Sequence, residues 1–461
     1  MYQIDFHTPV HVHFIGIGGI SMSGLAEILI KEGFTVSGSD ASRSALTSHL
    51  ESLGISVDYG QRAENIRRGI DVVVYTAAIH KDNPEFAAAV SAELPMLTRA
   101  ELLGQIMTNY RTAVAVAGTH GKTTTTSMLS MLFLNAQKDP TITVGGILPE
   151  IGGNIRVGHS DIFLTEACEY TNSYLSFHPT VGIILNIEED HMDFFKDIAD
   201  IRDSFHKFAC LLPADGLLVL NAEIEHPKEI TDDIKARTVT YGFTGTEDYY
   251  ADADSITYDE NGCASFLLYC RRQCIGPVAL NVPGIHNISN ALAALATALE
   301  LGIRFDDAAA GLNAFHGTQR RFQYKGQREG VTVVDDYAHH PTEIRATLTT
   351  ASHCPHRELW CVFQPHTYTR TQAFLNEFAQ ALSLADHVIL ADIYAAREQN
   401  TIGISSMDLL KELQKTGTDC CYLPSFEEIE KFLLKKCMHG DLLITMGAGD
   451  VLKIGENLLS R

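Results

Sequence analysis

The chain has 461 residues, and at about 150 residues per domain this length predicts roughly three domains. Its 35 Lys and Arg residues against 57 Asp and Glu residues give a formal net charge of −22. A field of this sign repels phosphate backbones and anionic lipids, so it argues against nucleic acid or a membrane surface as the partner.

The ten cysteines contain no C-x-x-C pair and no regular spacing typical of a disulfide framework, which favours a reducing compartment. The N-terminal stretch lacks the pattern of a signal peptide, and no apolar run is long enough to span a bilayer. We therefore expect a cytoplasmic protein.

The first hundred residues alternate between strand and helix patterns. A buried strand is predicted over 10–17, and a glycine-rich turn and a helix over 20–33 follow it. Further β-branched runs cover 35–40 and 71–78. This alternation predicts a parallel sheet with crossover helices, and we place the first domain at 1–107.

A second strand–helix series begins at residue 112. The strand over 112–119 leads into a helix over 122–135, and apolar runs follow at 161–167, 181–187 and 216–222. Short alternating strands are expected over 238–282, and an alanine-rich helix over 287–302. We predict a second nucleotide-type sheet and a central domain at 108–318.

The third series starts near Arg320. Strands are predicted over 331–337, 358–363, 386–392 and 441–446, with a helix over 369–384. The resulting prediction is an α/β protein of three domains, the last at 319–461. Each domain is built on a mainly parallel, Rossmann-like or P-loop-like sheet with flanking helices.

The stretch "AGTHGKTTTT" contains the Gly-Lys-Thr of a phosphate-binding loop, but Val116 stands where a Walker A motif has its first glycine. A strand, this turn and a helix would gather free N–H groups, the positive end of the helix dipole and the Lys122 ammonium around one point. We expect Lys122 to reach the β- and γ-phosphates of ATP and Thr123 to hold Mg²⁺. The alternative is an ordinary turn with a solvated lysine.

A second glycine-rich loop, "GIGGIS", follows the first predicted strand. Gly16 and Gly18 fit a dinucleotide-binding pattern, but Ser21 occupies the third glycine position, and Asp40 ends the second strand. The pattern suits NAD or any diphosphate attached to a ribose. A turn without a ligand is the alternative, and a separate ATP loop downstream makes a redox role harder to justify.

Two further candidates are an acid and a histidine at strand ends. Glu166 ends one predicted strand and His191 follows another, at the edge where open α/β sheets bind ligands. Both side chains could approach one metal ion, although a lone acid or histidine is more often a surface or satisfied residue. Neither "DHMD" nor "AHHP" has a spacing typical of zinc.

Seven motifs occur in the order found in one family: "GTHGKT", "TEACEY" (165–170), "NIEEDHMD" (186–193), "GIHNISNALAA" (284–294), "QRRF" (319–322), "DDYAHHP" (335–341) and "QPHTYTR" (364–370). On these motifs the chain resembles the Mur ligases, ATP-dependent amide-bond formers of peptidoglycan precursor synthesis, and their folylpolyglutamate synthase relatives. The resemblance covers nearly the whole chain. "GIGGISMSGLA", "DDYAHHP" and "QPHTYTRT" are most similar to family members that join L-alanine to UDP-N-acetylmuramate.

The resemblance implies four sets of site residues, with small molecules as the only expected partners. The ATP-binding set is Gly118, Thr119, His120, Gly121, Lys122, Thr123, Thr124, His286, Asn287, Asn290, Arg321 and Asp336. The UDP-sugar set is Gly16, Gly18, Gly19, Ser39, Asp40 and Thr76. The amino-acid set is Tyr337, His339, His366 and Arg370, and the Mg²⁺ ligands are Thr123, Glu166 and His191.

Within these sets the resemblance implies catalytic roles for Lys122, Glu166, His191 and Arg321. Asn287 and Asn290 have an ordinary alternative as polar residues of a helix start. One departure lies at Thr367, where some members of the family have an arginine. That difference affects the expected carboxylate contacts and not the reaction class.

The implied reaction activates a carboxylate. The lactyl carboxylate of the UDP-sugar would attack the γ-phosphorus of ATP, and the amine of L-alanine would then displace phosphate from the acyl phosphate. The histidines of "AHHP" or "QPH", with an ordinary pKa near 6.5, are candidate bases for the amine. The chain would act as a monomer or homodimer.

Three other functions stay open at this point. A related Mur ligase could add a ready-made peptide to the UDP-sugar, differing only in the third-domain pocket. An NAD-dependent oxidoreductase could use the first glycine-rich loop. A nucleotide-sensing protein would bind ATP and the UDP-sugar without releasing phosphate.

Overall fold

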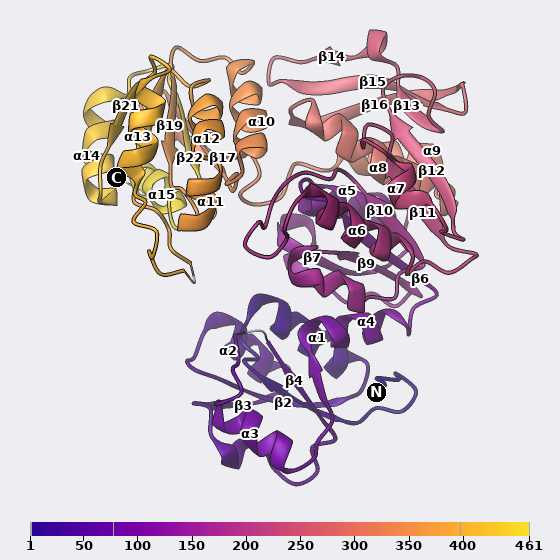
Figure 1. Ribbon diagram of the computed structural model, residues 1–461. Helices are drawn as coiled ribbons and strands as arrows, with labels where there is room; N and C mark the ends of the chain where they lie inside the picture. Colours follow the sequence, from indigo (N-terminus) through magenta and orange to yellow (C-terminus); the bar gives the residue numbers. More distant parts are fainter. Residues whose placement is uncertain (1, 77, 397, 461) are drawn as a thin grey trace.

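The computed structural model describes residues 2–76, 78–396 and 398–460 and contains three separate β-sheets (Figure 1). The N-terminal sheet lies at the bottom of the view, the central sheet above it, and the C-terminal sheet beside the central one. The strand predicted over 71–78 includes Ala77, which lies outside the described residues. The predicted α/β class with three parallel-dominated sheets is confirmed.

The N-terminal sheet is fully parallel, with the order β3-β2-β1-β4-β5. Its strands are β1 (His11–Ile15), β2 (Thr35–Asp40), β3 (Ser56–Tyr59), β4 (Val72–Tyr75) and β5 (Met96–Thr98). Its helices are α1 (Ile20–Lys31), α2 (Ala45–Ser52), η1 (Ala63–Asn65), α3 (Pro84–Ser91) and α4 (Arg99–Met107). The strand order reverses beside β1, so a ligand crevice is expected at the carboxyl ends of β1 and β4.

The central sheet has eleven strands in the order β14-β15-β13-β12-β11-β10-β6-β9-β7-β8, with β16 paired to β15. They are β6 (Thr112–Ala117), β7 (Thr141–Leu148), β8 (Gly153–Arg156), β9 (Ile162–Glu166), β10 (Val181–Ile184), β11 (Leu217–Asn221), β12 (Arg237–Gly242), β13 (Tyr249–Ala251), β14 (Thr257–Tyr258), β15 (Cys263–Cys270) and β16 (Gln273–Pro283). The pairs from β7 through β13 are parallel, and antiparallel hairpins finish both edges.

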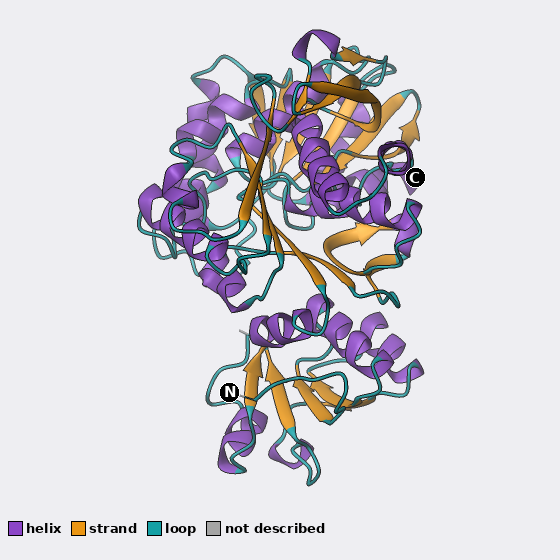
Figure 2. Ribbon diagram, turned by 90° about the vertical axis from the view of Figure 1, so that its right-hand side faces the viewer, coloured by secondary structure: helices purple, strands orange, loops and turns teal. Residues whose placement is uncertain are grey.

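Helices cover both faces of this central sheet (Figure 2). They are α5 (Lys122–Asn135), η2 (Pro149–Ile151), η3 (Tyr170–Ser176), α6 (Ile198–Ala209), α7 (Lys228–Thr231), η4 (Ala253–Ser255), α8 (His286–Glu300) and α9 (Phe305–Asn313). Helix α5 has the bounds that the sequence predicts. Strand β6, which leads into α5, lies between β9 and β10, so the loops that follow these three strands meet at one edge.

The C-terminal sheet has the order β17-β18-β22-β19-β20-β21 and is parallel except for β17. Its strands are β17 (Gln323–Arg328), β18 (Val331–Asp336), β19 (Leu359–Phe363), β20 (His387–Leu390), β21 (Asp419–Tyr422) and β22 (Leu442–Met446). Its helices are α10 (Pro341–Ser352), α11 (Tyr368–Ala373), α12 (Leu375–Leu382), α13 (Ser406–Gln414), α14 (Phe426–Lys436) and α15 (Leu452–Ser460).

The single helix predicted over 369–384 is wrong in one respect. Phe374 has φ −116° and ψ 28°, outside the helical region, and separates α11 from α12. Periodicity alone does not show this break, because the apolar spacing continues through it.

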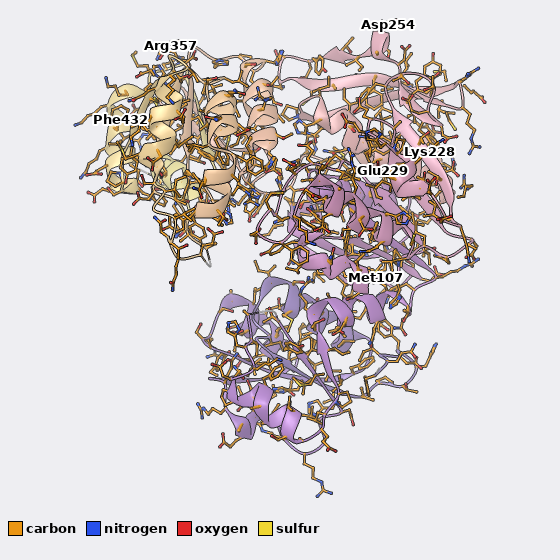
Figure 3. All side chains as sticks on the ribbon, viewed as in Figure 1. Met107, Lys228, Glu229, Asp254, Arg357 and Phe432 are labelled. Atoms are coloured by element: carbon orange, nitrogen blue, oxygen red, sulfur yellow. The ribbon has the colours of Figure 1, made fainter. Side chains whose placement is uncertain are left out.

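The apolar cores are not divided in the same way as the sheets. One cluster joins residues of the N-terminal sheet, such as Val12 and Leu103, to residues of the central sheet, such as Phe163. Met107, at the end of α4, belongs to this cluster and lies at the junction of the two sheets (Figure 3). The C-terminal sheet has its own two clusters.

Gly104 in α4 allows the closest approach across this junction. A Cβ atom at Gly104 would lie 1.9 Å from the carbonyl oxygen of Ser176 in η3. We expect Gly104→Ala to lower the thermal midpoint, because overpacking costs about 1–3 kcal/mol and outweighs the gain of about 1 kcal/mol in helix propensity. Differential scanning calorimetry measures the shift.

Gly455→Ala in α15 is the matched control for this substitution. A Cβ atom there would meet a methyl group of Val333 at 3.0 Å, and a side chain can move where backbone cannot. If the thermal midpoint falls no more for Gly104→Ala than for Gly455→Ala, the proposed close packing of α4 on η3 is contradicted.

None of the helices within the described part of the chain combines the length and the apolar character needed to cross a membrane.

Candidate active site

The phosphate-binding loop joins β6 to α5 through two glycines with positive φ. Gly118 has φ 143°, and Gly121, the N-cap residue of α5, has φ 84°. A Cβ atom at Gly121 would lie 2.5 Å from Oδ1 of Asn290 in α8. The loop therefore needs glycine for both its conformation and its packing, and it presents the start of a helix to a ligand.

Two acids reach this loop from the end of the neighbouring strand β9. The Lys122 ammonium donates to Glu169 Oε2 at 2.8 Å and to the carbonyl oxygen of Thr119 at 3.0 Å. Thr123 donates its hydroxyl to Glu166 Oε2 at 3.1 Å, and the Gly145 N–H donates to the other oxygen of Glu166. The strand order thus brings the predicted Lys122, Thr123 and Glu166 together.

The side chains around Lys122 and Thr123 include oxygen atoms that suit a hard divalent cation as ligands. Glu169 is only 2% exposed, and within the described residues its Oε1 has no hydrogen-bond partner. His191 Nε2 lies 3.8 Å from the same oxygen. Burying an unpaired carboxylate oxygen is costly, and oxygen ligands are those that Mg²⁺ prefers, so the residues fit the ion that the sequence predicts.

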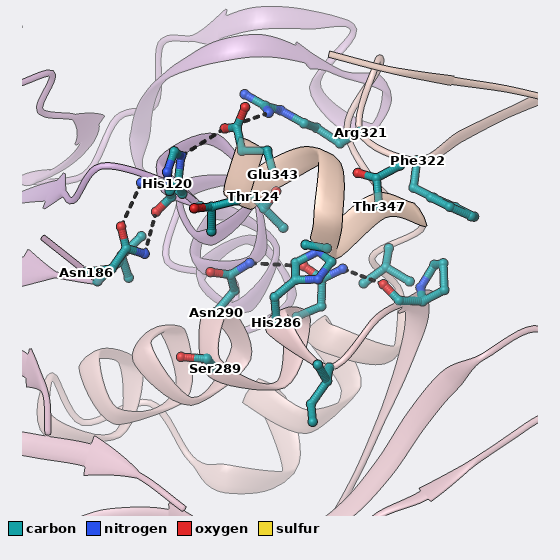
Figure 4. A pocket seen from close by; sticks show the side chains of 18 of the residues that line it. His120, Thr124, Asn186, His286, Ser289, Asn290, Arg321, Phe322, Glu343 and Thr347 are labelled. Carbon is teal, nitrogen blue, oxygen red and sulfur yellow. Dashed lines mark hydrogen bonds and ion pairs between the residues drawn. The ribbon is translucent and has the colours of Figure 1, made fainter. Parts of the chain in front are cut away.

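A cavity of about 630 Å³ opens beside the loop (Figure 4). Eight residues of the predicted ATP set line it: His120, Gly121, Thr124, His286, Asn287, Asn290, Arg321 and Asp336. The other four, Gly118, Thr119, Lys122 and Thr123, belong to the loop itself or to the first turn of α5. Apolar walls come from Phe243, Val282 and Phe315, a combination typical of a nucleotide pocket.

The polar residues of α8 also have structural partners. Thr125 donates its hydroxyl to Asn290 Oδ1 at 3.2 Å, and the Asn287 amide donates to the carbonyl oxygen of Pro283 at 2.7 Å. These bonds hold α8 against α5 and the end of β16. The two asparagines therefore stabilise the start of α8, as the ordinary alternative predicts, and they also line the cavity.

Two residues of the C-terminal domain complete the cavity. The Asp336 carboxylate accepts from the N–H groups of Phe322 and Ala338, at 2.8 and 2.7 Å, and burial raises its pKa to about 6. The Arg321 guanidinium lies 5.2 Å from the ring centroid of Tyr337. The predicted ATP site is thus shared between two domains.

The N-terminal glycine loop packs against the ends of β2 and β4. The N–H groups of Gly16 and Ile17 donate to the Ser39 carbonyl oxygen, each at 2.9 Å, and the Gly18 N–H donates to Asp40 Oδ2 at 2.8 Å. A Cβ atom at Gly16 would lie 3.1 Å from a methyl carbon of Thr76. The predicted UDP-sugar residues therefore gather at the carboxyl-terminal ends of β1, β2 and β4.

Two members of this predicted set contribute mainly backbone. Gly19 is the N-cap residue of α1, so the start of that helix follows this loop directly. The Ser39 hydroxyl is buried and donates to Glu85 Oε2, which leaves the carbonyl oxygen of Ser39 to hold the loop.

The predicted amino-acid set also comes together. The ring centroids of His339 and His366 are 5.6 Å apart, those of Tyr337 and His339 are 5.3 Å apart, and Arg370 Nη1 lies 3.2 Å from His366 Nδ1. Burial lowers the pKa of both His339 and His366 to about 4, and it also lowers that of His340. The expectation of a histidine base with an ordinary pKa is therefore wrong for all three.

Arg370 is paired with an acid of the central domain. Its Nη2 and Nε donate to Asp190 Oδ1 at 2.8 and 3.3 Å, and the two side chains are only 10% and 8% exposed. Burial of Asp190 disfavours its charged form, but Arg370, together with His191 and His340, outweighs burial and lowers the pKa of that carboxyl. Thr367 has φ 65°, and its hydroxyl accepts from the Arg370 N–H at 3.4 Å as the N-cap of α11.

Sequence reasoning missed three acids that the structure places in the site, Glu169, Asp190 and Glu343. Glu169 and Asp190 lie inside the quoted motifs "TEACEY" and "NIEEDHMD", and Glu343 lies two residues after "DDYAHHP". Their partners are far away in the chain, for example 180 residues for Asp190 and Arg370. The sequence does hold a signal for two of them, because Glu169 and Asp190 lie within three residues of the predicted metal ligands Glu166 and His191.

These features define a three-domain α/β protein with a P-loop between a Rossmann-like N-terminal domain and a third α/β domain. Three family models match consecutive segments: the Mur ligase family catalytic domain over 11–111, the Mur ligase middle domain over 116–298 and the Mur ligase glutamate ligase domain over 320–449. The chain belongs to the Mur ligase family, as its motifs predict, and it is an enzyme of the ligase class.

Relatives and solved structures agree with this assignment. The chain is 61% identical to a UDP-N-acetylmuramate–L-alanine ligase of Agathobacter rectalis over 461 residues, with both chains fully covered. It is 28% identical to the crystal structure of UDP-N-acetylmuramate-alanine ligase MurC from Thermotoga maritima, with a TM-score of 0.80 and 98% and 99% of the two chains covered. A murein peptide ligase from Psychrobacter arcticus is 25% identical, with a TM-score of 0.71 and 98% of each chain covered.

Proposed function

We propose that this enzyme uses ATP to join the lactyl carboxylate of UDP-N-acetylmuramate to L-alanine, giving ADP and phosphate in peptidoglycan precursor synthesis. The observation that carries the proposal is the full-length 61% identity to the ligase of that name from Agathobacter rectalis. The geometry supports it, because the three substrates have separate places: a cavity beside the phosphate-binding loop for ATP, the N-terminal glycine loop for the diphosphate, and a histidine–arginine cluster for the amino acid.

The three domains divide the substrates between them in this proposal. Residues 1–107 bind the UDP-sugar, 108–318 bind ATP, and 319–461 bind the amino acid. Gly16, Gly18 and the start of α1 would cradle the diphosphate, while Tyr337, His339, His366 and Arg370 would hold L-alanine. The enzyme would work in the cytoplasm on small molecules, as a monomer or homodimer.

In the first step, a lactyl carboxylate oxygen bonds to the γ-phosphorus of ATP, and the bond from this phosphorus to the bridging oxygen breaks. ADP leaves with the electron pair, and an acyl phosphate remains. The Lys122 ammonium and the Arg321 guanidinium stabilise the negative charge that spreads over the phosphoryl oxygens. Thr123, Glu166 and His191 would hold Mg²⁺, which neutralises phosphate charge when bound.

In the second step, the neutral amine of L-alanine attacks the acyl carbon, and phosphate leaves. The amine loses one proton on the way to the amide, and the released phosphate takes up this proton in the balanced reaction. Histidines with a pKa of about 4 are neutral at pH 7 but accept protons weakly, so His339 and His366 are better suited to orienting the amine than to removing its proton. Contact between the central and C-terminal domains would keep water from the acyl phosphate.

The test is phosphate release from ATP with UDP-N-acetylmuramate and each of L-alanine, glycine, L-serine and a tripeptide in turn. We expect L-alanine to give the fastest release, with a matching UDP-sugar–alanine product detected by mass spectrometry. Fastest release with the tripeptide would instead identify a peptide-adding ligase, the activity named for the Psychrobacter arcticus relative. Nicotinamide reduction without ATP consumption would exclude the proposal.

A further inference from the structure

Glu343, at the start of α10, stands between the predicted ATP site and the predicted amino-acid site. Its side chain is 15% exposed and comes from the C-terminal domain. Its two carboxylate oxygens face different groups. None of the predicted site sets includes this residue.

Oxygen Oε1 faces the ATP side. His120, in the phosphate-binding loop of the central domain, has its Nδ1 at 3.1 Å from this oxygen, in position to donate a hydrogen bond. The Nη1 atom of Arg321 lies 3.9 Å from the same oxygen (Figure 4). Both partners line the nucleotide cavity.

Oxygen Oε2 faces the amino-acid side. It accepts from the backbone N–H of His339 at 3.1 Å and from that of His340 at 3.4 Å, and His339 Nδ1 lies 3.4 Å away. The bond to His340 is half of a capping box at the start of α10. Helix capping therefore explains only the contacts of Oε2. It does not explain those of Oε1, which contacts His120 of the central domain.

Glu343 is ionised in this arrangement. Burial disfavours its charged form, but the neighbouring His339, the hydrogen bond from His120 and the Arg321 guanidinium together outweigh burial and hold the pKa of Glu343 well below the ordinary value. A negative carboxylate can therefore attract groups of both sites at once.

We propose that Glu343 is a positioning residue that couples ATP binding to amino-acid binding. It fixes His120 and Arg321 on one side and His339 on the other, so that each substrate finds its site better ordered when the other is bound. The proposal rests on the function proposed above. Coupling of this kind is reciprocal between the two ligands.

The experiment measures L-alanine affinity by titration calorimetry with UDP-N-acetylmuramate present, with and without a non-hydrolysable ATP analogue and Mg²⁺. For the unmodified enzyme we expect about tenfold tighter L-alanine binding with the analogue, within the range usual for coupled sites. For Glu343→Gln we expect this ratio to fall to about one. A purely structural cap would change the thermal midpoint and both affinities but leave the ratio intact.

Glu188→Gln is the matched control. Glu188 Oε2 also faces His120, at 3.7 Å, and accepts from the Thr342 hydroxyl, but no contact joins it to His339 within the described residues. This variant should keep the ratio of the unmodified enzyme. If Glu343→Gln does not fold, Glu343→Asp keeps the charge and the cap while shortening the reach to His120, and the same loss is expected.

A ratio that survives in the Glu343 variants, or a ratio of one in the unmodified enzyme, overturns the positioning role. Failure of the proposed function is seen separately, as absence of L-alanine-dependent phosphate release in the unmodified enzyme.

Discussion

Replacing Lys122 with alanine is expected to lower L-alanine-dependent phosphate release by about a thousandfold, the upper end of what one charged transition-state contact contributes. The side chain begins α5 and its ammonium lies among the loop carbonyl oxygens and Glu169. No other lysine among the described residues pairs with the acids of this site. A coupled phosphate assay measures the rate.

This substitution also leaves Glu169 without its cationic partner, and a buried unpaired carboxylate destabilises the fold. The double variant Lys122→Ala/Glu169→Gln removes that charge, so it should regain thermal stability without regaining activity. Lys138→Ala, at an exposed position just beyond the same helix, should behave as the unmodified enzyme. Substantial ligation by Lys122→Ala would exclude the assigned loop function.

Replacing Asp190 with alanine is expected to cost about 3–5 kcal/mol in the interaction between the central and C-terminal domains, the cost of leaving one partner of a buried ion pair alone. Arg370 would keep its charge while 10% exposed. Because Arg370 is also the proposed carboxylate contact, KM for L-alanine should rise more than KM for ATP. Calorimetry and steady-state kinetics measure the two effects.

The double variant Asp190→Ala/Arg370→Met separates stability from binding. It removes both charges and should recover most of the lost stability, while L-alanine binding stays weak. Glu51→Ala, which breaks a solvent-screened surface pair with Arg43, should change stability far less than Asp190→Ala. Equal losses of stability for Glu51→Ala and Asp190→Ala would contradict the proposed contribution of the buried Asp190–Arg370 pair.

The sequence predicts those parts of the site that follow a strand directly. Gly118 to Thr123 follow β6 and Glu166 ends β9, so the local pattern of an apolar run and a polar turn identifies them. The motif resemblance then adds residues such as Arg321 and Arg370, whose roles have no local signal.

The pairing of these residues depends on strand order, which local patterns do not contain. Lys122 meets Glu169 because β6 lies beside β9, and His191 comes within 3.8 Å of Glu169 because β6 also lies beside β10. Contacts between domains, such as His120 with Glu343, join residues 223 positions apart. The antiparallel hairpin of β7 and β8 was also not predicted, since its exposed glycines interrupt the apolar alternation.

The apolar cluster shared by the N-terminal and central sheets determines which part of the enzyme can swing. Separating those two sheets would expose apolar surface to water, which is unfavourable. The C-terminal domain instead contacts the central domain through ion pairs and hydrogen bonds, whose partners water can replace when the domains separate. We therefore expect the C-terminal domain to rotate about a hinge near residues 314–322 when nucleotides enter and leave, while the first two domains move together as one rigid body.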